Sequence, residues 1–154
     1  MDISIKLRLL EKYNFSLKRK DTDARKEAIQ SADIVFLCLP DAAAVEAVEL
    51  AKGSKAKIID TSTAHRVSEG WTYGFPELRG QREKIKNSTR IANPGCHASG
   101  FIAGVYPLVK SGLVPHDFPL CAYSLTGYSG GGKSLIAEYE DTGRDVRHES
   151  HRIY

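Results

Sequence analysis

The chain is poor in the features that mark secreted, membrane and nucleic-acid-binding proteins. Its 154 residues include only three cysteines, an odd number spread far apart, which suit a reducing cytoplasm better than a disulfide framework. The longest apolar run covers residues 34–39, far too short to cross a bilayer. Lys6 and Arg8 interrupt the N-terminal apolar residues, so no secretory signal is predicted. A net charge of only +3 gives no strong excess of one sign. We therefore expect a cytoplasmic protein that binds neither nucleic acid nor a membrane.

The apolar residues, 42% of the chain, are enough to build one sizeable core. Residues 33–39 form a short apolar run ended by Pro40, which predicts a strand buried on both faces, with Cys38 as an inert packing residue. Residues 56–60 predict a second buried strand, and Asp41 is expected to cap the helix between the two. Strand, helix and strand in this order predict a βαβ unit with a parallel sheet.

Other parts of the chain show weaker patterns. The predicted elements are a polar helix at 21–31, a short strand at 90–93, a helix at 98–110, a strand at 120–126 that contains Cys121, and a helix that starts from the glycine run and ends near Glu140. Residues 3–10 have helical spacing, residues 15–17 suggest a short strand, and residues 142–154 show no firm period. In parallel sheets the functional loops lie beyond the carboxyl ends of the strands, here after Leu39 and after Asp60.

Cys96 is the strongest candidate for a catalytic residue. A Pro94-Gly95 turn delivers its thiol to the expected first turn of a helix, where unpaired amides and the positive end of the helix dipole gather. A thiol in such a place is pushed toward the thiolate, which attacks acyl carbon. The alternative is a small buried hydrophobic residue, and the local pattern favours neither.

A glycine run at 127–132, followed by Lys133-Ser134, satisfies the spacing of a phosphate-binding P-loop. A true P-loop also needs a later strand that ends in an acidic residue, and no apolar strand follows Ser134. Two other interpretations stay open: exposed amides at a helix start that bind a phosphate or pyrophosphate, and a plain tight turn.

Histidine and arginine give few specific signals. His148 and His151 are three residues apart but have no third ligand, so we expect no metal site. His97 adjoins the candidate nucleophile, yet neighbouring helical residues point about 100° apart, a poor geometry for a nucleophile and its base. His65 and Arg66 follow a predicted strand, where Arg66 would either grip a carboxylate or phosphate in a bidentate manner or form a structural salt bridge.

Four segments in this order carry a family resemblance: DTSTAHR at 60–66, YGFPEL at 73–78, NPGC at 93–96 and GYSGGGK at 127–133. Together they resemble the N-acetyl-gamma-glutamyl-phosphate reductases of the shorter, second type, enzymes of arginine biosynthesis, from about Ile3 to about Asp141. The aspartate-semialdehyde dehydrogenases are a more distant relative with a comparable thiol.

The resemblance implies NADPH-dependent reduction of an acyl phosphate to an aldehyde. Cys96 would attack N-acetyl-gamma-glutamyl phosphate, expel phosphate and hold the acyl group as a thioester, and hydride transfer would lead to N-acetyl-glutamate semialdehyde. His65 and Arg66 would contact the substrate. The residues implied for the NADP(H) site are Leu39, Pro40, Thr61, Ser62, Thr63, Gly127, Ser129, Gly130 and Gly131.

The resemblance also implies a two-domain organisation. Residues 1–95 would form a partial Rossmann-type NAD(P)-binding domain that lacks its first strand and glycine-rich loop, and residues 96–154 would begin an α+β catalytic domain. We expect a chain truncated at both ends, without an identifiable general-base histidine, and a homo-oligomer if complete. A non-catalytic nucleotide- or phosphate-binding remnant and an aspartate-semialdehyde-dehydrogenase-like enzyme are the alternatives.

Overall fold

The computed structural model describes residues 21–140. The predicted elements within residues 3–17, and His148 and His151 of the C-terminal tail, lie outside the described residues. The chain divides into two compact units, Met1–Ser99 and Gly100–Tyr154.

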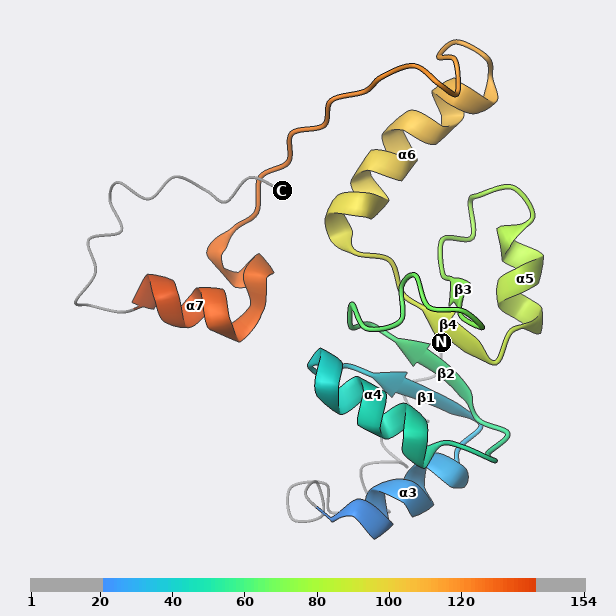
Figure 1. Cartoon of the computed structure of the whole chain (residues 1–154), viewed down its shortest axis with the longest axis vertical. Helices are drawn as coiled ribbons and strands as arrows, with labels where there is room; N and C mark the ends of the chain where they lie inside the picture. The colour runs from blue at the N-terminus through green and yellow to red at the C-terminus, as the bar shows by residue number, and fades with distance from the viewer. Residues whose placement is uncertain (1–20, 141–154) are drawn as a thin grey trace, which may run out of the picture. The chain divides into compact units, whose positions relative to one another are not determined.

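The first unit contains a four-stranded parallel sheet in the order β1-β2-β4-β3 (Figure 1). The register places Val35 opposite Ile58 and Leu37 opposite Asp60. The strands are β1 (Ile34–Leu37), β2 (Lys57–Asp60), β3 (Thr72–Tyr73) and β4 (Arg90–Ala92). The predicted βαβ unit is therefore confirmed, whereas β3, with only two residues, was not foreseen because it is too short to show a pattern.

Helices α3 (Thr22–Gln30) and α4 (Asp41–Leu50) start in different ways. Asp21 caps α3, since its carboxylate accepts from the backbone amides of Asp23 and Ala24 at 3.0 and 3.1 Å. Pro40 is the N-cap residue of α4, and no side chain caps that helix. The prediction that Asp41 caps α4 is wrong because Asp41 is the first helical residue and its carboxylate accepts from Thr63 instead.

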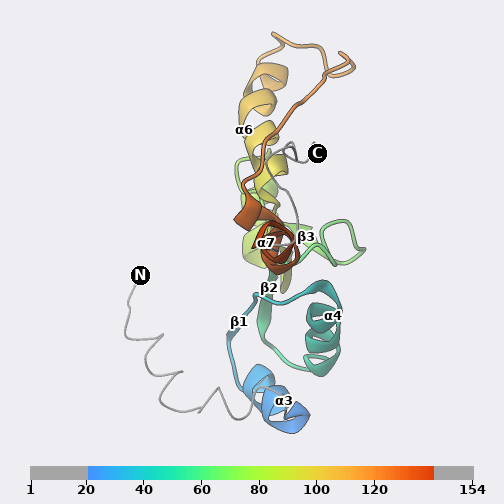
Figure 2. The same ribbon diagram turned by 90° about the vertical axis from the view of Figure 1, so that its left-hand side faces the viewer.

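The core of this unit lies between α4 and one face of the sheet. It consists of Leu37, Ala47, Ala51 and Ile58, with partly buried residues such as Ile29 and Trp71 packed against it. Figure 2 shows α4 on one side of β1 and β2. This one-sided cover stabilises the sheet through the apolar area removed from water.

The prediction that residues 33–39 are buried on both faces is wrong. Ile34 and Phe36 are 52% and 66% exposed, because they point away from α4 and no element among residues 21–140 covers them. Cys38, predicted to be an inert packing residue, is exposed just after β1.

Two more helices lie before and after β4 in the sequence, and the second of them continues from the first unit into the second. Helix α5 (Gln81–Asn87) precedes β4, and it was not predicted. After β4 the chain turns through residues 93–95 into α6 (Cys96–Lys110), which starts two residues before the predicted bound. Gly112, with a φ of 76°, ends α6 as expected for a helix C-terminus.

The second unit contains a short 3-10 helix η1 (Tyr128–Gly131) and helix α7 (Gly132–Glu140). The predicted helix that starts from the glycine run and ends near Glu140 is therefore confirmed as α7. The prediction of a strand at 120–126 is wrong: this segment has no regular structure, and Cys121 is exposed. Its apolar side chains, among them Leu120 at 47% and Leu125 at 59% exposure, find no strand to pair with among the described residues. No helix within residues 21–140 is both long and apolar enough to cross a membrane.

Candidate active site

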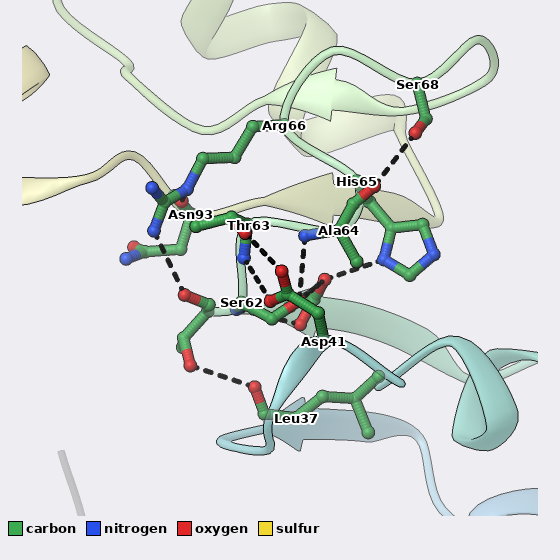
Figure 3. A network of polar contacts seen from close by, with 11 residues as sticks. Leu37, Asp41, Ser62, Thr63, Ala64, His65, Arg66, Ser68 and Asn93 are labelled. Atoms are coloured by element: carbon green, nitrogen blue, oxygen red, sulfur yellow. Dashed lines mark hydrogen bonds and ion pairs between the residues drawn. The ribbon is translucent and has the colours of Figure 1, made fainter. Parts of the chain in front are cut away.

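The carboxyl ends of β1, β2 and β4 bring three loops to one edge of the sheet. The amide of Thr61 donates to the carbonyl of Leu37 at 3.0 Å, and the amide of Asn93 donates to the carbonyl of Asp60 at 2.7 Å. These backbone bonds continue the sheet pairing past the last strand residues. The loops after Leu37, Asp60 and Ala92 are therefore held side by side (Figure 3).

Asp60 organises the loop after β2. Its side chain is fully buried and accepts from the Ser62 amide at 3.0 Å, the Ser62 hydroxyl at 2.7 Å and His65 Nδ1 at 2.7 Å. Burial raises the pKa of the Asp60 carboxyl, but the hydrogen bonds from His65 and Ser62 outweigh it and hold the pKa below its ordinary value. The carboxylate is thus an internal anchor for the loop.

His65 is part of the interior of the first unit. It is only 8% exposed, and its ring stacks on Trp71 with centroids 4.1 Å apart and planes 16° from parallel. One ring nitrogen is engaged by Asp60. These contacts give His65 a structural task, and its predicted contact with substrate remains a prediction.

A second carboxylate holds the same loop from outside. Asp41, at the start of α4, accepts from the Thr63 amide at 2.9 Å and also from the Thr63 hydroxyl. The Thr63 hydroxyl and amide lower the pKa of the Asp41 carboxyl. Because Thr63 is tied to Asp41 in this way, its hydroxyl faces a protein partner at the place where the sequence predicted cofactor contact.

Arg66 spans the loops after β2 and β4. Its Nη2 donates to the Thr61 carbonyl and its Nε donates to the Asn93 carbonyl, both at 3.3 Å. Figure 3 shows the guanidinium reaching over Asn93. The structural alternative predicted for Arg66 was a salt bridge, but the contacts found are two charge-assisted bonds to neutral backbone carbonyls.

Cys96 is the first residue of α6 and is exposed. The first turn of the helix is formed, since the Ser99 amide donates to the Gly95 carbonyl at 2.9 Å. The alternative of a small buried hydrophobic residue is therefore wrong for this chain. The thiol stands at a helix start, separated from the end of β4 by the turn at residues 93–95, as the sequence predicted.

Steric constraints within the second unit explain why glycine occupies positions 130–132. A side chain at Gly130 would collide with the Thr126 hydroxyl, and one at Gly131 would collide with Leu135. Gly132 has a φ of 73°, which L side chains rarely adopt. These constraints are those of a tight turn, the simplest of the interpretations that the sequence left open.

The predicted site residues thus fall into two groups. Those of the first unit gather at the carboxyl end of the sheet: Leu39, Pro40, Thr61, Ser62, Thr63, His65, Arg66 and Cys96. Gly127, Ser129, Gly130 and Gly131 belong to the second unit. Sequence reasoning missed the anchoring roles of Asp41, Asp60 and Trp71, because their partners become neighbours only in the folded loop. Within residues 21–140, no three His, Cys, Asp or Glu side chains form a group that could hold a metal ion.

A parallel sheet with polar loops at the carboxyl ends of its strands is typical of the open α/β class of proteins, which bind ligands at that edge. Residues 7–88, more than half of the chain, match the family described as "Semialdehyde dehydrogenase, NAD binding domain". The chain belongs to this family.

Several relatives of the chain share one enzyme name. The chain is 54% identical over 124 residues to N-acetyl-gamma-glutamyl-phosphate reductase of Trichormus variabilis, an alignment that covers 80% of the chain and 38% of that protein. It is 49% identical over 151 residues to the protein of the same name from a Chelativorans species, covering 94% of the chain and 49% of that protein. The chain therefore spans less than half the length of these two relatives.

One solved structure shares the fold. Aspartate semialdehyde dehydrogenase II from Vibrio cholerae superposes with a TM-score of 0.55 at 16% identity, over 80% of the chain and 37% of that structure. At this identity the likeness extends to the fold only. It agrees with the four-stranded parallel sheet described above.

Proposed function

We propose that the chain takes part in the NADPH-dependent reduction of N-acetyl-gamma-glutamyl phosphate to N-acetyl-glutamate semialdehyde, a step of arginine biosynthesis. The observation that carries the proposal is the exposed Cys96 at the start of α6, on a loop that Arg66 and the end of β2 hold in place. Identities of 54% and 49% to the reductases above support the same substrate.

Cys96 acts as the nucleophile in this proposal. Its thiolate attacks the acyl carbon, a C–S bond forms, and the C–O bond to phosphate breaks with its electron pair leaving on phosphate. The amides of the first turn of α6 are the groups proposed to stabilise the oxyanion that develops on the former carbonyl. When the aldehyde is released, the C–S bond breaks and the electron pair returns to sulfur as the thiolate.

NADPH, when bound, supplies the hydride that reduces the thioester carbon. The residues present fit such a group, because Leu39 is 39% exposed beside Pro40 and the polar end of β2, at adjacent strand ends. An apolar side chain next to hydroxyl and backbone groups suits the nicotinamide ring, which is flat and carries one amide. Binding at Thr61, Ser62 and Thr63 in the first unit and at Gly127, Ser129, Gly130 and Gly131 in the second, and the choice of NADPH over NADH, belong to this proposal.

Substrate contact falls to Arg66 in the same proposal. A guanidinium has five N–H donors, and its bonds to the Asn93 and Thr61 carbonyls use one on Nε and one on Nη2. Its positive charge lies on the loop next to the thiol, where the phosphate of the substrate would arrive. His65 contributes by fixing this loop through Asp60 and Trp71.

The finer organisation of the protein is also proposed. Residues 1–95 form the cofactor domain, in which β1 lies at an edge of the described sheet and so can pair with a further strand, and residues 96–154 begin the catalytic domain. A homo-oligomer in the cytoplasm is expected by analogy with a biosynthetic enzyme of this kind.

The test compares the full chain with its Cys96→Ser variant. We measure NADPH binding by fluorescence titration and the consumption of N-acetyl-gamma-glutamyl phosphate. The expected result is NADPH binding by both proteins and acyl-phosphate consumption by the parent alone. Binding in both with no consumption by the parent would instead favour a non-catalytic nucleotide-binding module, and no binding in either would remove the cofactor from the proposal.

A further inference from the structure

We propose that Arg66 is a positioning residue for Cys96: its guanidinium fixes the turn at residues 93–95 and so determines where α6 and its thiol begin. The inference rests on the proposed function only in taking Cys96 as the reactive thiol. It concerns a contact that forms wholly within the first unit.

The first observation is the way in which Arg66 joins two loops. The Thr61 carbonyl comes directly after β2, and the Asn93 carbonyl comes directly after β4, the neighbouring strand. The Arg66 guanidinium donates to both at 3.3 Å (Figure 3). A planar group with donors in a fixed fork can bridge two carbonyls that a single ammonium group cannot hold in the same geometry.

The second observation concerns Gly95, the residue before the cysteine. An ideal Cβ at Gly95 would lie 2.7 Å from Nη1 of Arg66 and 3.3 Å from its Cζ, and the three nearest heavy atoms all belong to Arg66. Gly95 is not among the glycines with positive φ, so its backbone is open to any residue. A side chain at position 95 would therefore meet the guanidinium and not a backbone restriction, and the guanidinium would have to shift to make room.

The consequence reaches the thiol through the backbone. The Gly95 carbonyl accepts from the Ser99 amide at 2.9 Å in the first turn of α6. A guanidinium that lies against Gly95 and holds the Asn93 carbonyl thus fixes both sides of Pro94. The amides around Cys96 keep their orientation only while this turn is fixed.

Arg90 offers a matched control in the same unit. Its Nη1 donates to the carbonyls of Ala56 and Thr89, both at 3.0 Å. Arg90 begins β4 and Ala56 precedes β2, so this clamp ties the amino ends of the same two strands. It has the same chemistry as the Arg66 clamp but lies at the other end of the strands from Cys96.

The experiment measures the rate of iodoacetamide labelling at Cys96 in the full chain. The exposed Cys38 and Cys121 are replaced by serine so that one thiol remains. We expect Arg66→Met and Arg66→Lys to lower the rate about two- to fivefold, the size of effect expected when a thiolate is no longer held against the positive end of the helix dipole. Arg90→Met should leave the rate unchanged while lowering the urea midpoint to a similar extent as Arg66→Met.

Three results would overturn the proposal. A parental rate in Arg66→Lys would mean that charge alone matters, an equal loss in Arg90→Met would mean general destabilisation, and a parental rate in Arg66→Met would mean that no positioning occurs. The assay uses no acyl phosphate and no NADPH, so its outcome is independent of whether the proposed reduction takes place.

A second experiment approaches the same contact from Gly95. Gly95→Ala should lower the labelling rate in the parent, but have little further effect in an Arg66→Ala background, where the colliding group is gone. Gly104→Ala serves as the control, since no atom lies within 4 Å of its ideal Cβ. Additive effects of Gly95→Ala and Arg66→Ala on the labelling rate would contradict the coupling. This second experiment does not use Arg66→Met, so it does not depend on the stability of that variant.

Discussion

Replacement of Asp60 should be among the most damaging single changes in the first unit. The carboxylate has no exposed surface and accepts three hydrogen bonds, two from Ser62 and one from His65. Asp60→Ala leaves all three donors without their acceptor in a buried place. A buried donor left without its acceptor costs about 1–3 kcal/mol of unfolding free energy, so with three such donors we expect a loss of about 3–5 kcal/mol.

Asp60→Asn is the more selective version of this change. Its amide oxygen still accepts from the Ser62 amide, and its NH2 group faces the Ser62 hydroxyl and His65 Nδ1, which are both able to accept. The expected cost is therefore only about 1–2 kcal/mol. The order of stability should be parent, then Asn, then Ala.

Urea unfolding followed by tryptophan fluorescence measures this prediction, because Trp71 stacks on His65 and reports on the network. At a slope of about 2 kcal/mol per M, Asp60→Ala should lower the midpoint by about 1.5–2.5 M. Asp41→Ala is the matched control, since Asp41 also accepts from an amide and a hydroxyl but is exposed to solvent, and its loss should be smaller. If Asp60→Ala costs no more than Asp41→Ala, the reasoning about a buried anchor is refuted.

Three further predictions concern acid, the core and the thiol. Folding lowers the pKa of both Asp41 and Asp60, so their contribution to stability is fully present above the ordinary value of 3.8 and is lost as the pH falls through the lowered folded values. Urea midpoints measured from pH 6 to pH 3 should therefore decrease. The decrease should be smaller in Asp60→Asn, which has lost one of the two carboxylates. Ile58→Ala should cost about 2–5 kcal/mol because Ile58 is fully buried, whereas Phe36→Ala, at a side chain 66% exposed, should cost less than about 1 kcal/mol; equal losses in urea unfolding would contradict the one-sided core. Iodoacetamide at neutral pH should label Cys96 faster than the other two cysteines, which peptide mass spectrometry can follow; all three are exposed, so a slower or equal rate at Cys96 would point to an unactivated thiol.

The parts of the fold that could be predicted are those with local causes. The apolar runs around β1 and β2, the proline before α4 and Gly53 after it are signals that each segment carries by itself. The start of α6 at Cys96 follows in the same way from the Pro94-Gly95 turn. These elements position the candidate nucleophile, which is why the sequence could point to it.

The errors have a common physical cause, since they depend on partners distant in the sequence. The apolar pattern of 120–126 satisfies the requirements of a strand but says nothing of whether a neighbouring strand exists. Burial of Phe36 likewise depends on what covers the second face of the sheet. The Asp60 anchor needs a loop that folds back by five residues onto its own strand end, and the Arg66–Gly95 contact joins segments almost thirty residues apart. No local pattern contains that information.

The most direct test of the central claim, that Cys96 is an acyl-transfer nucleophile, is the intact mass of the full chain after incubation with N-acetyl-gamma-glutamyl phosphate in the absence of NADPH. The account predicts a single N-acetyl-glutamyl adduct that maps to Cys96, is released by hydroxylamine as a thioester is, and is absent from Cys96→Ser. An unmodified parent chain, or an adduct that persists in Cys96→Ser, would contradict it.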